Sequence, residues 1–225
     1  MGIAENIKKI RDEIPENVTL LAAAKTRNAE EIREAIDSGI THVGENYVQE
    51  AEKIHEKLGE YASRVHWHMI GHLQTNKIHK ALSIFDVIQT IESIKKAQAI
   101  NKRASTHNRT VSVYIEINIG NELSKSGLKP DYEEIKQVAE GISLLEWLRL
   151  EGIMTMGPFS STPEELRPYF KKTKEIFDRI RDLNLKNAPM RTLSMGMSNS
   201  FKVAIEEGST MVRLGTILFG NRAYP

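Results

Sequence analysis

The 225-residue sequence predicts one (β/α)8 barrel, an α/β fold, from three observations. Eight short segments are apolar throughout or alternate between apolar and polar residues, as strands do. Segments with helical spacing of apolar residues separate them, which is typical of parallel strands joined by helical crossovers. No linker-like stretch divides the chain, whose length fits a barrel of about 200 to 250 residues. A doubly wound open sheet shows the same alternation and remains the competing architecture.

A leading helix is expected over residues 3–14, where isoleucines recur at helical spacing among charged residues. The strands are expected at 18–24, 40–43, 65–70, 84–90, 110–119, 148–154, 191–194 and 210–214. The first intervening helix is capped by Asn28 and ends at Gly39. The others are expected at 47–58, 75–82, 92–104, 131–140, 164–182 and 199–206. Together they make residues 1–225 a single predicted domain.

Charge and composition exclude several classes of protein. The formal net charge is +1, from 31 basic and 30 acidic residues, so nothing calls for nucleic acid as a partner. The absence of cysteine rules out disulfides, thiolate nucleophiles and cysteine-bound metals. No apolar stretch approaches the roughly 20 residues of a membrane span, and the charged first residues are no signal peptide. We expect a cytoplasmic protein with no membrane partner.

Lys25 is the first charged side chain after the buried strand 18–24. A lysine at the mouth of such a strand loses hydration, which lowers its pKa from about 10.4 and exposes a neutral, nucleophilic amine. The alternative is a lysine that extends from the barrel rim into water. The strand alone favours this second interpretation.

The loops after the last two strands have the composition of an anion site. The segment 194–198 joins a strand to a helix through Gly196, with Ser198 expected as the N-cap, and 214–216 repeats the pattern through Gly215. Such loops leave backbone N–H groups directed at an anion, and barrels commonly bind phosphate there. The alternative is a pair of ordinary capped turns.

Two further features are open at this stage. Arg213 ends an apolar strand and must pair either with a barrel carboxylate (Glu45, Glu116 or Glu151) or with a ligand, since a buried guanidinium keeps its charge. His66 and His68 share a strand face, but no carboxylate cluster completes a site, so a metal is not expected.

Several motifs, taken together, resemble the pyridoxal 5′-phosphate (PLP) homeostasis proteins, the YggS/PROSC family. The family looks like the barrel domain of alanine racemase without its second domain. The matching pieces run in order along nearly the whole chain: Ala24-Lys25-Thr26, Gly44-Glu45-Asn46-Tyr47-Val48-Gln49-Glu50, 67–77, Ile117-Asn118-Ile119, Lys125-Ser126-Gly127, Glu151-Gly152-Ile153-Met154, Ser194-Met195-Gly196-Met197-Ser198 and 212–216 with Phe219-Gly220.

The resemblance implies a fold type III PLP barrel, with the cofactor held as a Schiff base on Lys25. It implies that the phosphate lies among Ser194, Met195, Gly196, Ser198, Gly215 and Thr216. It further implies that Arg213 faces the pyridine nitrogen and that Asn46 lies by the ring. Two residues depart from the family pattern: Ala24 replaces a serine, and Ser200 replaces an aspartate under the phosphate loop.

The function implied is intracellular PLP homeostasis, in which a monomer stores the cofactor and delivers it, with apo PLP-dependent enzymes as the expected recipients, without established catalysis. An amino-acid racemase is the alternative; it needs a second base besides Lys25, for which Tyr47, Tyr114 and Tyr224 are candidates. A third hypothesis is a phosphosugar enzyme that uses Lys25 as an acid, and it predicts no chromophore.

Overall fold

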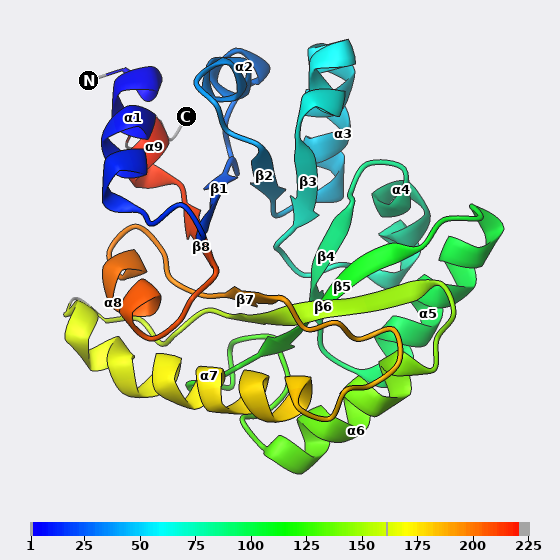
Figure 1. The fold of residues 1–225 in the computed structure, drawn as a ribbon. Helices are drawn as coiled ribbons and strands as arrows, with labels where there is room; N and C mark the ends of the chain where they lie inside the picture. Colours follow the sequence, from blue (N-terminus) through cyan, green and yellow to red (C-terminus); the bar gives the residue numbers. More distant parts are fainter. Residues whose placement is uncertain (1, 161, 221–225) are drawn as a thin grey trace.

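Eight parallel strands close into a barrel in the order of the sequence, with β8 pairing with β1. The computed structural model describes residues 2–160 and 162–220 and confirms the predicted (β/α)8 barrel (Figure 1). The strands are β1 (Thr19–Ala23), β2 (His42–Glu45), β3 (His66–Met69), β4 (Val87–Ile91), β5 (Val111–Ile117), β6 (Leu148–Thr155), β7 (Thr192–Ser194) and β8 (Met211–Leu214). Every strand direction is the same, so the carboxyl ends gather on one face of the barrel.

Helices surround the strands, and the main core fills the layer between them. They are α1 (Ile3–Glu13), α2 (Ala29–Asp37), α3 (Val48–Leu58), α4 (Ile78–Leu82), α5 (Ile94–Thr106), α6 (Tyr132–Ser143), α7 (Arg167–Arg181), α8 (Phe201–Glu206) and α9 (Thr216–Phe219), with short 3₁₀ turns η1 (Gly59–Arg64), η2 (Thr75–Lys77) and η3 (Pro163–Leu166). Asn28 caps α2 as predicted, and Glu31 completes a capping box. A second, smaller apolar cluster, which includes Leu21, Tyr114 and Met154, lies apart from this core.

Three predicted boundaries differ from the structure for a reason that the contacts show. β2 starts two residues late, because the Ile40 N–H still bonds to the Ala35 carbonyl at the end of α2. β4 starts at Val87 rather than Ile84, whose N–H bonds back to Ala81. α6 passes through Gly141 instead of ending there. A Cβ at Gly141 would lie 2.7 Å from Ile94 Cδ1 of α5, too close for a larger residue to fit without movement. That glycine therefore allows α5 and α6 to approach closely.

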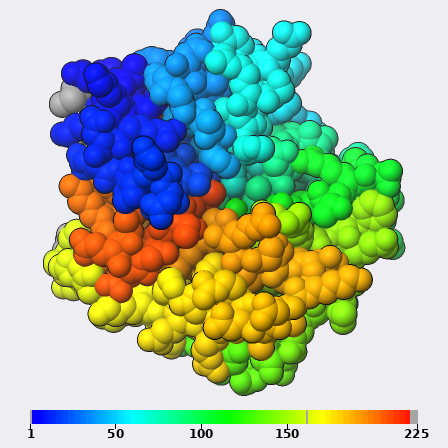
Figure 2. Space-filling model, in the orientation of Figure 1, coloured from blue at the N-terminus to red at the C-terminus, as the bar shows by residue number. Residues whose placement is uncertain are grey.

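The first and last described helices, α1 and α9, lie side by side. The predicted leading helix is α1, which packs beside α9 (Figure 1) in a molecule whose first residues cover one side of the surface (Figure 2). Asn6 Nδ2 of α1 donates a 3.0 Å hydrogen bond to the Leu218 carbonyl of α9. This contact holds the segment after β8 in place, at one edge of the pocket described below.

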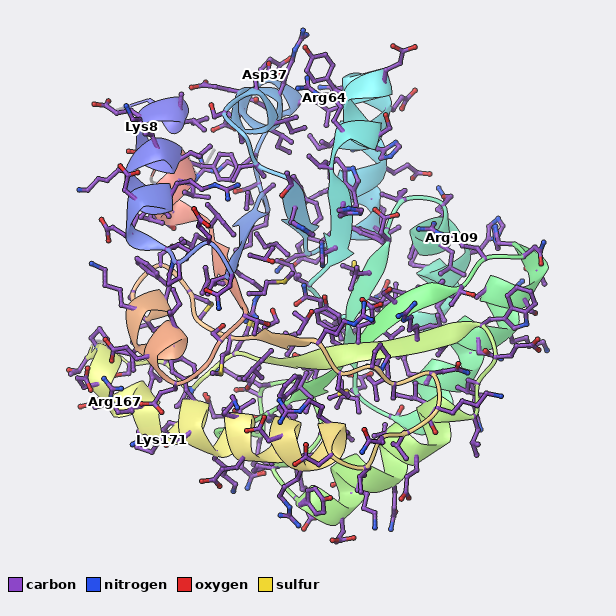
Figure 3. All side chains as sticks on the ribbon, viewed as in Figure 1. Lys8, Asp37, Arg64, Arg109, Arg167 and Lys171 are labelled. Carbon is purple, nitrogen blue, oxygen red and sulfur yellow. The ribbon has the colours of Figure 1, made fainter. Side chains whose placement is uncertain are left out.

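Charged side chains lie mainly on the outer surfaces of the helices (Figure 3). Arg64 donates to Asp37 across 3.0 Å, with both side chains half exposed. Exposed pairs of this kind stabilise a fold by about 0 to 1 kcal/mol, so they contribute less than the packed layers do. Among the residues described, no helix is both long and apolar enough to cross a membrane.

Candidate functional site

A pocket of about 550 Å³ opens at the carboxyl ends of β1, β6, β7 and β8. Six of the nine predicted cofactor residues line it together: Lys25, Gly196, Ser198, Arg213, Gly215 and Thr216. The volume is within the range of small-molecule sites. The barrel thus brings into one cavity residues that are up to 191 positions apart in the sequence.

Lys25 lies two residues beyond β1, on a turn whose conformation is restrained by the residues that follow it. Thr26 has a left-handed backbone (φ 68°), a conformation that a branched residue adopts only when its surroundings impose it. Arg27 holds the turn by donating to the Phe219 and Gly220 carbonyls across 3.3 and 2.6 Å. The turn places the half-buried Lys25 side chain at the pocket wall.

The loop after β7 exposes backbone donors to the same pocket. Gly196 has φ 96°, and a Cβ there would lie 2.6 Å from Ala204 Cβ, so only glycine fits. The N–H groups of Ser198, Asn199 and Thr216 bond to no acceptor within 2–160 or 162–220. A loop with free N–H groups suits an anion, and it fits the donor set that a phosphate requires.

The prediction of Ser198 as N-cap was wrong. Ser200 occupies the N-cap of α8, and its Oγ accepts the Met197 N–H across 3.2 Å. The chain makes an extra turn first, in which the N–H groups of Ser200 and Phe201 both bond to the Met197 carbonyl. Ser198 consequently stays in the loop, half buried, and lines the pocket.

Arg213 forms a charged part of the pocket wall although it is only 4% exposed. Its Nη1 donates to the Ser194 carbonyl and Oγ across 2.8 and 2.7 Å, and its Nη2 donates to the Thr155 carbonyl across 2.7 Å. Burial lowers the pKa of Arg213 to about 10, with Glu116 opposing the shift, so the guanidinium is charged at neutral pH. Within the described residues it forms no salt bridge, and protein oxygens without charge hold it instead.

Glu45 and Glu116 are both buried, and each has one carboxyl oxygen, Oε2, that forms no hydrogen bond with the described residues. Burial, and next Glu50, raises the pKa of Glu45 to about 8. Burial, and next Glu92, raises the pKa of Glu116 to about 7, although Arg213 opposes the shift. Glu116 therefore titrates near neutrality, close enough to Arg213 for their charges to interact.

The other three predicted residues lie elsewhere. Ser194 and Met195 are fully buried and do not line the pocket, although Ser194 supports Arg213. Asn46 lines a separate cleft of about 420 Å³ at the ends of β2 and β3, together with Gly71 and Lys77. The implied position of Asn46 beside the cofactor ring stays a prediction.

The sequence reasoning missed two cations of the pocket, Arg27 and Lys125. Lys125 Nζ bonds to Glu122 Oε1 and the Gly157 carbonyl across 2.6 and 3.1 Å, which ties the loop after β5 to the loop after β6. The sequence feature that could have indicated Lys125 is the polar loop 120–130 in which it lies. In the structure, Leu128 forms backbone hydrogen bonds with Glu116 and Asn118, so this loop folds back over the end of β5.

The metal and second-base candidates lie outside the pocket. His68 is fully buried while His66 is exposed, and no metal-binding group of three or more side chains occurs in the described part of the chain. Tyr114 lies within the smaller apolar cluster, and burial raises its pKa to about 12. Tyr47 lines the second cleft, and Tyr224 lies outside the described residues.

Comparison with known proteins gives a consistent set of relatives. The model of the family "alanine racemase, N-terminal domain" matches residues 2–223. A Vibrio alginolyticus protein named pyridoxal phosphate homeostasis protein is 38% identical over 235 residues, which cover 99% of both chains. The solved structure of PipY from Synechococcus elongatus, with PLP bound, is 30% identical and superposes with a TM-score of 0.87, covering 97% of this chain and 100% of PipY.

A more distant structure shows the fold alone. Alanine racemase of Clostridium difficile is 18% identical with a TM-score of 0.80. The match covers 99% of this chain but 57% of the racemase, so the racemase has a large part with no counterpart here.

Proposed function

The chain belongs to the alanine racemase N-terminal domain family, and from this we propose that it binds pyridoxal 5′-phosphate for intracellular PLP homeostasis. The protein stores the cofactor and releases it, with the cofactor held covalently on Lys25. The observation that carries the proposal is one pocket with Lys25 on one wall and the glycine-bearing loop 194–200 on another.

The residues present fit the three parts of this cofactor. The aldehyde suits the amine of Lys25: a carbon–nitrogen double bond forms at Nζ and one water leaves. The phosphate, with about −1.5 to −2 charges, suits the N–H groups of Ser198, Asn199 and Thr216. The pyridine nitrogen suits Arg213, whose permanent charge keeps that nitrogen unprotonated and the ring a weak electron sink.

The weak electron sink favours a carrier over a catalyst, because breaking a bond at the substrate α-carbon needs a ring that accepts electrons. Racemisation also needs bases on both faces of a substrate, and no tyrosine of the described residues lines the pocket. Measuring α-proton exchange on several amino acids tests this choice: we expect exchange no faster than with free PLP. Enzyme-like exchange would instead favour the racemase.

We also propose that the protein works as a monomer in the cytoplasm and passes PLP to apo PLP-dependent enzymes. Light scattering gives the mass in solution, and mixing with an apo aminotransferase, in the presence of an excess of a PLP-trapping amine, tests direct delivery. Direct delivery predicts that the aminotransferase regains activity despite the trap.

Lys25→Ala is the test of cofactor binding. The native protein is expected to turn yellow with PLP and, after borohydride reduction, to carry the added mass on the peptide containing Lys25. The variant should gain no such mass, and its affinity for PLP should fall by at least ~10-fold, about 1.4 kcal/mol.

Lys77→Ala, in the second cleft, is the matched control and should bind as the native protein does. Lys125→Ala tests the second pocket amine. Reduction products on Lys125 in the Lys25→Ala variant, at native affinity, would refute the assignment of Lys25.

A further inference from the structure

A chain of hydrogen bonds, buried except at its His42 end, connects Arg213 to the amino end of the barrel. Ser194 Oγ, which accepts from Arg213, donates to Gln89 Oε1 across 2.8 Å. Gln89 Nε2 bonds to His68 Nδ1 across 2.9 Å, and His68 Nε2 to His42 Nδ1, also across 2.9 Å. These five residues, here called the spine, lie on β8, β7, β4, β3 and β2.

The direction of every bond in the spine is set from the Arg213 end. A guanidinium can only donate, so Ser194 Oγ accepts from it and has its own proton for Gln89 Oε1. The amide nitrogen of Gln89 then donates to His68 Nδ1, which fixes His68 as the neutral Nε2–H tautomer. Burial, with His42 and His66 adding to it, lowers the pKa of His68 well below its usual value, consistent with a neutral ring.

The spine restrains the guanidinium strongly. Arg213 Nη1 gives both hydrogens to Ser194, and Nη2 gives one to the Thr155 carbonyl. At most two of the five N–H donors remain for a ligand, so the plane of the group is fixed relative to the pocket. Because the Ser194 hydroxyl donates to Gln89 Oε1, its hydrogen points away from Arg213 and its lone pairs are turned toward the guanidinium.

We propose that Gln89, supported by His68 and His42, is a positioning residue that fixes the orientation of Arg213 toward the ring-nitrogen end of the bound cofactor. The role in binding rests on the proposed function, whereas the effect on Arg213 itself does not. Gln89 is fully buried and does not line the pocket, so it acts only through Ser194. The charged neighbour whose field reaches Arg213 is Glu116, outside the spine.

The spine has an alternative explanation: its members could simply satisfy one another's buried polar groups without positioning Arg213. The two explanations predict different results when a bond of the spine is removed. If the spine only satisfies polar groups, its loss lowers stability and leaves Arg213 as it was. If the spine positions Arg213, its loss frees the guanidinium to rotate. Rotation of the Arg213 Nη groups about the Cζ–Nε bond is measurable by ¹⁵N NMR in the cofactor-free protein.

Gln89→Met is the first variant, because methionine keeps the volume and removes both polar ends. We expect guanidinium rotation about five- to tenfold faster, the change that follows from losing one hydrogen bond of about 1 kcal/mol. In the PLP-loaded protein, the release rate of the cofactor should rise by a similar factor. Ser194→Ala, which breaks the chain at the next link, should give the same result, and the double variant should add nothing further.

Gln89→Glu is the conservative variant and should restore slow rotation. Its carboxylate accepts from Ser194, and the two histidines can reverse their tautomers so that each bond of the spine survives. Thr173→Val is the control for loss of a buried hydroxyl, because Thr173 Oγ1 donates to the Tyr169 carbonyl within α7, away from the spine.

Rotation in folded Gln89→Met and Ser194→Ala proteins that stays within twofold of the Thr173→Val control would overturn the proposal. Unfolding in urea, measured for each variant, separates a loss of stability from a change in Arg213. Native protein that takes up no PLP would refute the proposed function alone, since the NMR measurement needs no cofactor.

Discussion

Two cavities open near the carboxyl end of this barrel, and each has a lysine and a glycine at its wall. The pocket at β1, β6, β7 and β8 adds a buried guanidinium and a loop of free N–H groups. The cleft at β2 and β3 is lined by Met69, which is buried and apolar, and by the side chains of His72 and Gln74, which are exposed. A lysine at a strand end is therefore not sufficient to define a site: the buried cation and the main-chain donors distinguish the pocket from the cleft.

The largest effect expected is that of an alanine at the glycine of each cavity. At Gly196 a Cβ would meet Ala204 Cβ at 2.6 Å in a left-handed backbone, so the phosphate loop must move. We expect Gly196→Ala to lose about 2 to 4 kcal/mol of unfolding free energy and to bind PLP more than ~10-fold more weakly. Urea unfolding and equilibrium dialysis measure the two changes.

Gly71→Ala is the matched variant in the cleft. A Cβ at Gly71 would lie 2.3 Å from the Asn46 carbonyl oxygen, so the backbone of Asn46 must shift. We expect a comparable loss of stability but a loss of PLP affinity of only about threefold, equal to roughly 0.7 kcal/mol. Equal losses of affinity in the two variants would mean that the cleft and Asn46 belong to the binding site as much as the loop does.

The next effect concerns the two buried carboxyl groups and the pH dependence of stability. The pKa of Glu116 is raised to about 7 from 4.5 in the folded protein, so this group favours the folded state fully below pH 4.5 and loses that contribution as pH rises through about 7. The shift corresponds to roughly 3 kcal/mol at most. Glu116→Gln should remove this part of the fall in unfolding free energy between pH 5 and 8.

Glu45→Gln, measured in the same way, distinguishes the effect of Glu45 from that of Glu116. The pKa of Glu45 is raised to about 8, so its contribution disappears at higher pH than that of Glu116. Both variants should reduce the dependence of the unfolding free energy on pH. Only Glu116→Gln should change the rate of PLP release, because of these two carboxyl groups only Glu116 acts on Arg213. An unchanged curve for Glu116→Gln, or a changed release rate for Glu45→Gln, would contradict this difference.

The sequence predicted the barrel and six of the residues that line the pocket, for a definite physical reason. Strand periodicity, the capping of α2 by Asn28 and the glycines after β7 and β8 are local signals, and a parallel barrel necessarily brings its strand ends together. Six predicted residues lie in one cavity because each is near the carboxyl end of a strand or follows that end by no more than four residues.

What the sequence could not predict depends on pairing across the barrel. The spine joins β4 to β7 through Gln89 and Ser194, 105 positions apart, and no local pattern indicates that partner. The turn that makes Ser200 the N-cap of α8 depends on the Met197 carbonyl, and the loop 120–130 closes through Leu128 only because β5 holds it. Such contacts follow from the register of the whole barrel.

The smallest effect expected is that of Ser200→Asp, which introduces the residue usual in the family. An aspartate at the N-cap of α8 can accept the Met197 N–H as Ser200 Oγ does, and its charge favours the helix start, so we expect about 0.5 kcal/mol of added stability. The same charge in the phosphate pocket repels a dianion, and PLP affinity should fall about two- to threefold, or roughly 0.5 kcal/mol. Pyridoxal, which has the aldehyde but no phosphate, is the control and should bind both proteins equally. Equal losses for PLP and pyridoxal would place the effect of Ser200 on the aldehyde end of the pocket instead of on the loop 194–200.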